Sequence, residues 1–212
     1  MKNYFKFNTD RKYSPKLLCF LAMWISHIFN PSIIGCAILI WSAAVTSMDR
    51  TVFLLLLLFC VLVPAGSILF MVYSKKIDSV YPKKRQQREK PLIIGLISYT
   101  MAWLIAFKMA DDPITLAIVS VFVIATASVL VINRYWKISI HCVGVSAAAI
   151  LVISENDQWI FWCILPIMLI SWARLHLCAH TFSQVLGGLI LGAFWGVLGL
   201  LIFIGTTYDA SL

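Results

Sequence analysis

Long apolar runs separated by short polar stretches constrain the fold of this chain more than any other feature. Several of these runs extend for 16 or more residues without a formal charge. The seven apolar runs are Leu17–Val45, Thr51–Tyr73, Pro91–Phe107, Pro113–Ile132, Ile138–Ser154, Gln158–Ala173 and Thr181–Ile204. A helix of about 20 residues spans a bilayer, and a soluble domain of 212 residues could not bury a chain that is 61% hydrophobic. We therefore predict an all-α, polytopic transmembrane helical bundle.

The first run is too long for one straight span and is interrupted at Asn30-Pro31. Because proline lacks a backbone N–H and clashes with the preceding turn, it breaks a helix at this point. We expect an interfacial or kinked stretch followed by a crossing near Ile33–Val45. No repeat and no second domain are evident, so we predict a single membrane domain over residues 1–212, with about six core helices and one extra.

The last run is rich in glycine and is expected to pack closely against its neighbours. Its glycines are Gly187, Gly188, Gly192, Gly196 and Gly199. Small residues let helix backbones approach each other within a bilayer. This helix is therefore expected to pack closely against other helices inside the bilayer.

The basic residues predict an orientation for the chain. The chain carries 17 Lys and Arg, nine Asp and Glu, and a net charge of +8. If the chain changes sides at each of seven spans, 15 basic residues share the N-terminal side: Lys2, Lys6, Arg11, Lys12, Lys16, Lys75, Lys76, Lys83, Lys84, Arg85, Arg88, Lys90, Arg134, Lys137 and Arg174. Cytoplasmic loops are enriched in such residues, so this side, with the basic segment 1–16, is predicted to be cytoplasmic. The net positive charge also favours binding to anionic membrane lipids. We expect no nucleic-acid partner, and we make no prediction of the oligomeric state.

Three polar clusters fall on this predicted cytoplasmic side. One precedes the third span, one begins the fifth with Ser139 and His141, and one runs from Arg174 through His180 to Gln184. The first cluster contributes the candidate phosphate-binding residues Lys83, Arg85, Arg88 and Lys90. Two histidines, a serine and several basic side chains are therefore expected to converge at one membrane surface.

This combination of residues suits a phosphate ester. Arg and Lys neutralise phosphate oxygens, and a helix start adds a further donor. One histidine can attack phosphorus while a second protonates the leaving alkoxide. His180 and Gln184 lie four residues apart, so the Gln184 oxygen is expected to accept a hydrogen bond from the imidazole. No cluster of metal-binding carboxylates is evident in the sequence, so we expect Arg and Lys to neutralise the phosphate, with no metal or cofactor.

The order and spacing of these residues resemble the type 2 phosphatidic acid phosphatase superfamily, which shares its core with vanadium haloperoxidases. That family has three motifs: Lys-x6-Arg-Pro, Pro-Ser-Gly-His and Ser-Arg-x5-His-x3-Asp. The matching stretches here are Lys83-x6-Lys90-Pro91, Ile138-Ser139-Ile140-His141 and Ala173-Arg174-x5-His180-x3-Gln184. The resemblance extends from about residue 74 to residue 204.

The resemblance implies a role for each matched residue. His180 would form a phosphohistidine intermediate, and His141 would be the general acid. The phosphoryl oxygens would be held by Lys83, Lys90, Arg174 and Ser139, with Arg85 or Arg88 replacing the family's arginine. The implied activity is metal-independent hydrolysis of a lipid phosphate, such as phosphatidic acid, phosphatidylglycerol phosphate or a polyprenyl phosphate or diphosphate.

The resemblance and the charge sorting differ on the membrane side. We expect an integral protein of a bacterial inner (plasma) membrane. Many bacterial members of the family are expected to act on the outer face of the membrane. The distribution of basic residues here places the candidate site on the cytoplasmic face, and we adopt this orientation.

The chain departs from the family pattern at several positions. Gln184 replaces an aspartate, Lys90 replaces an arginine, and Ile138 and Ile140 replace proline and glycine. A neutral amide orients His180 but stabilises an imidazolium less than a carboxylate does. Two alternatives therefore stay open: a phosphotransferase on the same fold, and a catalytically inactive lipid-binding or transport protein.

The remaining histidines and cysteines have no expected role in chemistry. His27 lies in none of the three polar clusters, so we expect it to have a structural role. His176 and His180 lie four apart, but no further ligands of matching type accompany them, so a metal or haem pair is not expected. The six cysteines are scattered without CxxC spacing, so we expect small buried hydrophobic residues.

Overall fold

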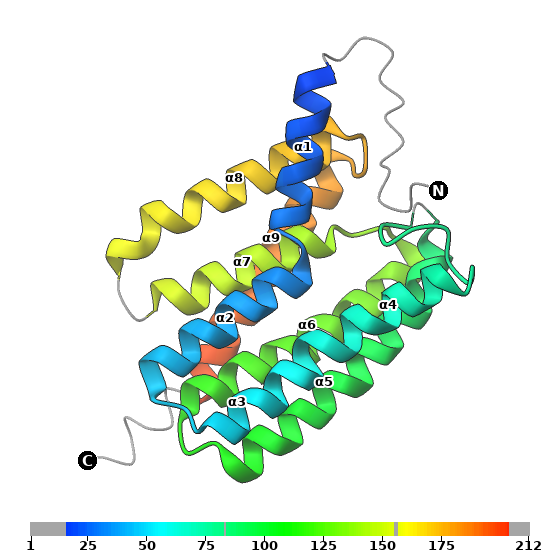
Figure 1. Cartoon of the computed structure of the whole chain (residues 1–212). Helices are drawn as coiled ribbons and strands as arrows, with labels where there is room; N and C mark the ends of the chain where they lie inside the picture. The colour runs from blue at the N-terminus through cyan, green and yellow to red at the C-terminus, as the bar shows by residue number, and fades with distance from the viewer. Residues whose placement is uncertain (1–15, 83, 155–156, 204–212) are drawn as a thin grey trace.

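The computed structural model of the protein describes residues 16–82, 84–154 and 157–203, and the regular secondary structure in these ranges is entirely helical (Figure 1). The α-helices are α1 (Lys16–Ile28), α2 (Pro31–Thr46), α3 (Arg50–Leu57), α4 (Val63–Tyr73), α5 (Glu89–Met109), α6 (Pro113–Tyr135), α7 (Ile140–Ile153), α8 (Ile160–His176) and α9 (Phe182–Phe203). A π-helical turn, η1 (Leu58–Leu62), joins α3 to α4, and the 3₁₀ turns η2 (Arg85–Arg88) and η3 (Asp157–Trp159) precede α5 and α8. The predicted all-α class is confirmed.

The predicted break after the first apolar stretch is present. Asn30 accepts a hydrogen bond from the Ser32 N–H at 2.9 Å, and Pro31 is the first residue of α2. A proline at this position costs no hydrogen bond, because its missing N–H has no partner in the first turn. The axes of α1 and α2 differ by 46°, so α1 leaves the direction that the other helices share (Figure 1).

Four helical segments are long and apolar enough to cross a membrane, and the bent α1–α2 pair would make a fifth. The four are Arg50–Tyr73, Arg85–Met109, Pro113–Tyr135 and Phe182–Ile202. The remaining two apolar helices, α7 with 14 residues and α8 with 17, are shorter. At about 1.5 Å per residue, α7 covers about 21 Å of the roughly 30 Å hydrocarbon core of a bilayer. The described part of each of the seven predicted apolar runs is mainly helical, and the count of seven spans stays a prediction.

The π-helical turn inside the α3–α4 segment has a local cause. Pro64 has no N–H to donate to the carbonyl four residues earlier, and its ring crowds that carbonyl. The turn before Pro64 widens as a result. The Ser98 hydroxyl of α5 donates to the Phe59 carbonyl within this turn, which fixes α5 against it.

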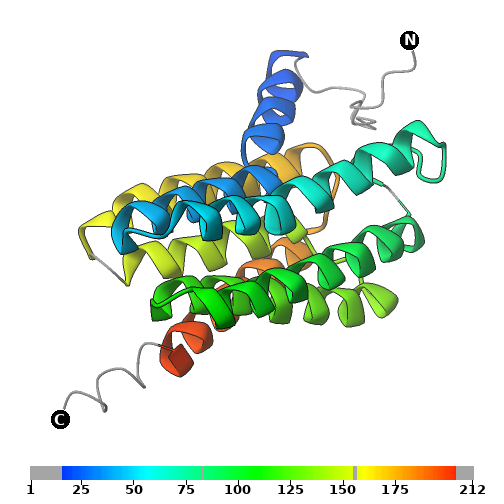
Figure 2. The ribbon, with the colours of Figure 1, turned by 60° about the horizontal axis from the view of Figure 1, so that its bottom comes forward.

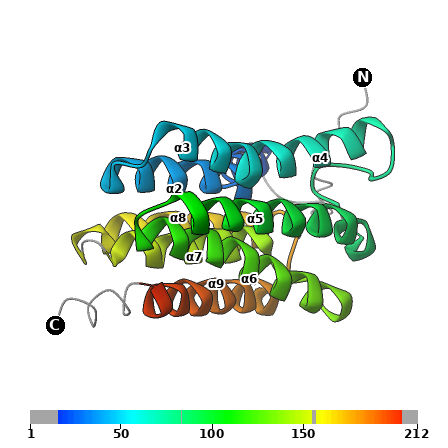
Figure 3. The same cartoon turned by 90° about the horizontal axis from the view of Figure 1, so that it is seen from below.

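The glycines of α9 permit the predicted close packing. A Cβ on Gly188 would lie 2.7 Å from the Ser139 carbonyl oxygen, and one on Gly192 would overlap the Val143 carbonyl. A Cβ would also come within 3.0 Å of a side chain at three further glycines: Trp136 at Gly187, Ile150 at Gly196 and Val121 at Gly199. As a result α9 lies along α7 and α6 (Figure 3), and the start of α7 is held against the start of α9.

The three polar clusters of the sequence gather at one end of the bundle. The ends of α4, α6 and α8 and the starts of α5, α7 and α9 meet there, next to the break between α1 and α2 (Figure 1, Figure 2). All six cysteines are free. The expectation that they are buried is wrong for Cys178, which is exposed, while Cys19, Cys36 and Cys163 are half-buried.

Candidate functional site

A cavity of about 150 Å³ lies at this end of the bundle. Its lining combines two guanidinium groups, from Arg88 and Arg174, with two imidazoles, from His141 and His180. Tyr81, from the loop between α4 and α5, adds a phenol. No Asp or Glu occurs among the described residues that line it. Cationic and imidazole nitrogens without a lining carboxylate favour an anionic ligand.

His180 is positioned by the turn that ends α8. Cys178 adopts a left-handed backbone with φ of 50°, a conformation common just after a helix C-terminus. The N–H groups of Ala179 and His180 then donate to the Arg174 carbonyl at 3.1 and 3.3 Å. This turn therefore holds Arg174 and His180 side by side at the cavity.

The hydrogen bonds of His180 assign its tautomer. Its Nδ1 lies 3.2 Å from Gln184 Oε1 and 3.3 Å from the Lys137 carbonyl oxygen. The Thr181 N–H also donates to Gln184 Oε1 at 3.2 Å, which fixes the amide with its oxygen toward the ring. Both neighbours of Nδ1 are acceptors, so Nδ1 carries the proton and Nε2 carries the lone pair. The predicted contact between His180 and Gln184 is present.

Burial and nearby cations keep His180 neutral. Burial, together with the charges of Arg174, Arg88 and Lys137, lowers the pKa of His180 to about 2, against a small opposing effect of the Lys137 carbonyl. The ring is therefore uncharged at pH 7, which is the form in which Nε2 can act as a nucleophile.

His141 occupies the first turn of α7 and is 6% exposed. The backbone of Ser26 is a hydrogen-bond partner of its ring, and the Tyr81 ring packs on it with centroids 5.5 Å apart. Its Nε2 has no hydrogen-bond partner among the described residues. A buried nitrogen of this kind in a cavity wall is suited to a polar ligand atom.

The two arginines of the cavity are held by different contacts. Arg88 is buried, and its Nε and Nη1 each donate to a carbonyl at 3.3 Å, of Pro82 and of Ile138. Arg174 is 2% exposed, and its Cζ lies 6.0 Å from the centre of the Tyr81 ring. Arg88 therefore joins the loop to the start of α7, and Arg174 stacks on the loop's tyrosine.

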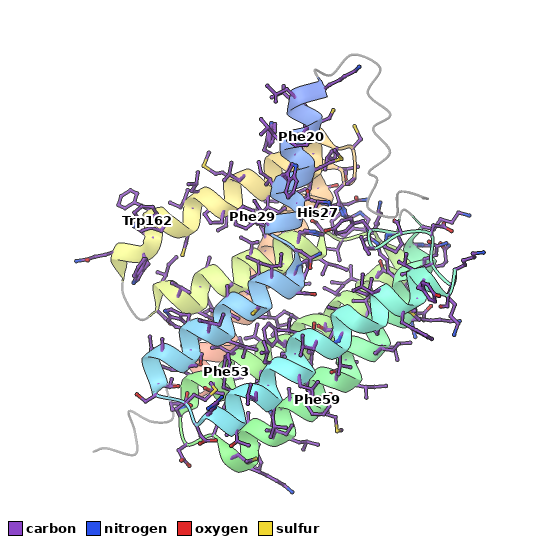
Figure 4. All side chains as sticks on the ribbon, in the orientation of Figure 1. Phe20, His27, Phe29, Phe53, Phe59 and Trp162 are labelled. Atoms are coloured by element: carbon purple, nitrogen blue, oxygen red, sulfur yellow. The ribbon has the colours of Figure 1, made fainter. Side chains whose placement is uncertain are left out.

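Tyr81 and His27 were not predicted as site residues. The His27 Nδ1 lies 2.9 Å from the Tyr81 hydroxyl, to which Asn30 Nδ2 also donates at 3.1 Å. His27 is on the side of α1 that faces this loop (Figure 4). Burial raises the pKa of Tyr81, so its hydroxyl is neutral. A lone tyrosine in a polar loop has no spacing signal that would single it out.

Three of the predicted phosphate-binding residues, Ser139, Arg85 and Lys90, do not line the cavity. The Ser139 hydroxyl is buried and donates to Cys142 Sγ at 3.1 Å, while its N–H donates to the Gln184 carbonyl at 3.3 Å. Arg85 Nη1 donates to the Tyr135 carbonyl at 2.6 Å, and Lys90 is exposed. Lys83 lies outside the described residues. Of the first cluster, the structure thus places Arg88 at the cavity.

The histidine pair four residues apart does not share one site. His176 stacks on Trp172 with ring centroids 5.0 Å apart, and its Nε2 lies 3.9 Å from Cys19 Sγ on α1. His180 lines the cavity instead. No group of three or more His, Cys, Asp or Glu suited to a metal ion occurs in the described ranges.

The comparisons with known proteins add no family. Neither the protein-family models, the curated proteins nor the solved structures contain a match to this chain.

Proposed function

We propose that the protein is a membrane-embedded phosphatase of lipid phosphates, of the type 2 phosphatidic acid phosphatase kind. One observation carries the proposal: Arg88, His141, Arg174 and His180, from distant parts of the chain, line a single cavity. The substrate would be a phosphate monoester or diphosphate of a lipid, with its headgroup in this cavity.

The outer surface of the helices supports a membrane location. On α8, the side chains of Phe161, Trp162 and Met168 are 64% to 79% exposed, and Trp162 points away from the bundle (Figure 4). Large apolar side chains gathered on one face of a helix mark a surface that meets lipid or another protein. Together with the long apolar segments, they favour a bundle with lipid on its outside.

In the first step, the lone pair on His180 Nε2 attacks phosphorus and the P–O bond to the lipid breaks. His141, which burial and the neighbouring arginines keep neutral, takes the proton of the bound phosphate monoanion on Nε2 and passes it to the leaving alkoxide, which departs as the lipid alcohol. Arg88 and Arg174 stabilise the negative charge that is shared by the phosphoryl oxygens. Gln184 and the Lys137 carbonyl hold the Nδ1 proton and keep the ring in the reactive tautomer.

In the second step, water attacks the phosphohistidine. His141, now neutral, takes a proton from this water, the P–N bond breaks, and inorganic phosphate leaves. If another alcohol replaces water, the same intermediate transfers the phosphoryl group instead.

Purified protein is expected to release phosphate from at least one member of a panel of phosphatidic acid, phosphatidylglycerol phosphate and polyprenyl phosphates. Release from none of them, by protein that is folded, would favour the non-enzymatic lipid-binding alternative.

The glutamine at position 184 is expected to limit the rate. In Gln184→Glu, a carboxylate of the same length accepts the hydrogen bond from Nδ1–H and stabilises the positive charge that develops on the attacking ring. We expect kcat to rise by about tenfold and the pKa of His180 to rise, so that the acid limb of the pH profile moves toward neutral pH. Gln184→Leu removes the acceptor and is expected to lower kcat. An unchanged kcat in both variants would show that position 184 does not orient His180.

The basic end of the bundle is proposed to face the cytoplasm. Lys84 is exposed just before the η2–α5 segment and Asp111 is exposed just after it, so the two lie at opposite ends of that segment. In a background with Cys178→Ser, an impermeant maleimide is expected to label D111C in intact cells and K84C only after permeabilisation. The reverse pattern would place the cavity on the outer face and refute the orientation assigned from the charges.

A further inference from the structure

The corner between α1 and α2 forms part of the cavity wall. Asn30, Pro31 and Ser32 line the cavity there, although the sequence motifs of the site all lie further along the chain. From this corner, hydrogen bonds reach two side chains of the cavity, His141 and Tyr81. The corner is therefore placed to orient groups that take part in the proposed reaction.

The end of α1 leaves the Ser26 carbonyl available to the His141 ring. In a continuous helix this carbonyl would accept the N–H of Asn30, four residues further on. The Asn30 N–H instead donates to the His27 carbonyl at 3.2 Å, and Pro31 has no N–H. The Ser26 backbone is a hydrogen-bond partner of the His141 ring, and its carbonyl is the atom concerned because its N–H lies inside α1. A carbonyl only accepts, so the bonded ring nitrogen carries the proton; it is Nδ1, since Nε2 has no partner among the described residues.

The Tyr81 side chain connects the corner to His141 and Arg174. Asn30 Nδ2 donates to its hydroxyl at 3.1 Å, so the hydroxyl in turn donates to His27 Nδ1, 2.9 Å away. The Tyr81 ring packs on the His141 ring with centroids 5.5 Å apart, and Arg174 Cζ lies 6.0 Å from its centre. Two hydrogen bonds to the corner thus hold a ring that packs on the proton-transfer histidine of the proposed mechanism.

We propose that Tyr81 is a positioning residue for His141, and that the corner between α1 and α2 holds it in place through His27 and Asn30. This inference rests on the proposed phosphatase function and gives the first two helices a part in it. With its Nδ1 bonded to the Ser26 carbonyl and its ring packed on Tyr81, His141 keeps one orientation and presents Nε2 for proton transfer. A general acid or base acts only within hydrogen-bonding reach of the atom that exchanges the proton, so loss of this orientation slows the transfer.

Leaving groups of different basicity test this role. The alkoxide of a lipid phosphate needs a proton as it departs, whereas 4-nitrophenolate departs from 4-nitrophenyl phosphate without one. Misplacement of His141 therefore slows release of the lipid alcohol much more than release of nitrophenolate, while general damage to the site slows both alike. The measurement is the first turnover of purified protein with the best substrate of the lipid panel and with 4-nitrophenyl phosphate, because later turnovers also depend on hydrolysis of the phosphohistidine.

Tyr81→Phe keeps the ring and removes both hydrogen bonds to the corner. We expect release of the lipid alcohol to fall by about tenfold and release of nitrophenolate to stay within about twofold. His27→Leu removes the acceptor of the Tyr81 hydroxyl and is expected to give the same selective loss. The double variant should lose no more than Tyr81→Phe alone, because both substitutions break one contact. Tyr135→Phe is the matched control, since its side chain is 81% exposed, and should change neither rate.

The outcomes separate the positioning role from the phosphatase function. Equal losses with both substrates in Tyr81→Phe, or no loss with either, would overturn the positioning role and leave the phosphatase proposal standing. Unmodified protein that releases no lipid alcohol would overturn the phosphatase proposal, and the positioning role with it. If Tyr81→Phe does not fold, His27→Leu decides by the same comparison. As a readout without turnover, nitrogen NMR of the histidine rings should show the His141 proton on Nδ1; a proton on Nε2 would contradict the bond to the Ser26 carbonyl.

Discussion

Replacement of His180 by alanine is expected to lower the rate of phosphate release by about 10⁴-fold or more. The variant loses the nitrogen that attacks phosphorus, and no second histidine of the cavity is held with its Nε2 free and its Nδ1 fixed by two acceptors in the described structure. The measurement is phosphate release from the best substrate of the lipid panel, at saturating substrate concentration.

His176 provides the matched control for this variant. It lies on the same end of the bundle four residues earlier, but it packs against Trp172 and Cys19 rather than in the cavity. We expect His176→Ala to keep activity within a few-fold of the unmodified protein. Equal activity of His180→Ala and the unmodified protein would refute the proposed nucleophile.

Replacement of Arg174 by alanine is expected to lower kcat/KM by about 10³-fold. This guanidinium is almost completely buried beside His180, where the low dielectric strengthens its interaction with phosphoryl oxygens. Arg174→Lys keeps the charge but loses the planar fork that binds two oxygens. An intermediate loss of about 10-fold to 100-fold is therefore expected for the lysine variant.

Arg134 is the control for the arginine. Its side chain is 62% exposed and lies 3.6 Å from Glu89 in an exposed ion pair, which contributes little to stability. We expect Arg134→Ala to leave kcat/KM unchanged. If Arg174→Ala and Arg134→Ala have equal kinetics, the buried guanidinium does not bind the transferred phosphoryl group.

The helices could be predicted because their signals are local. The apolar runs indicated roughly where each helix begins and ends. The Asn30-Pro31 pair indicated the break between α1 and α2, because a capping side chain and a proline act on the turn in which they occur. The π-helical turn before Pro64 was not predicted, because a helix accommodates an internal proline by a kink, a break or a widened turn, and the sequence does not distinguish these forms. Helix α7, with 14 residues, is also shorter than the predicted run Ile138–Ser154.

The site was predicted in part. The predicted contact between His180 and Gln184 is present, but His180 lies two residues before α9, so the contact depends on the turn that precedes this helix as well as on the four-residue spacing. Which basic residue of the first cluster reaches the cavity depends on the 3₁₀ turn before α5, which directs Arg88 inward and leaves Lys90 exposed. The position of Tyr81 depends on contacts with α1, and no pattern in the loop itself records those contacts.

The central claim is that one cavity places His180 Nε2 against a phosphorus atom. Rapid acid-free quenching of the protein during turnover of a radiolabelled lipid phosphate, followed by peptide mapping and phosphorus NMR, tests this claim directly. We expect a base-stable, acid-labile phosphoryl group on His180, bonded to Nε2 because Nδ1 is occupied by its hydrogen bonds to Gln184 and the Lys137 carbonyl. Turnover without label on His180, or label on Nδ1, would contradict it.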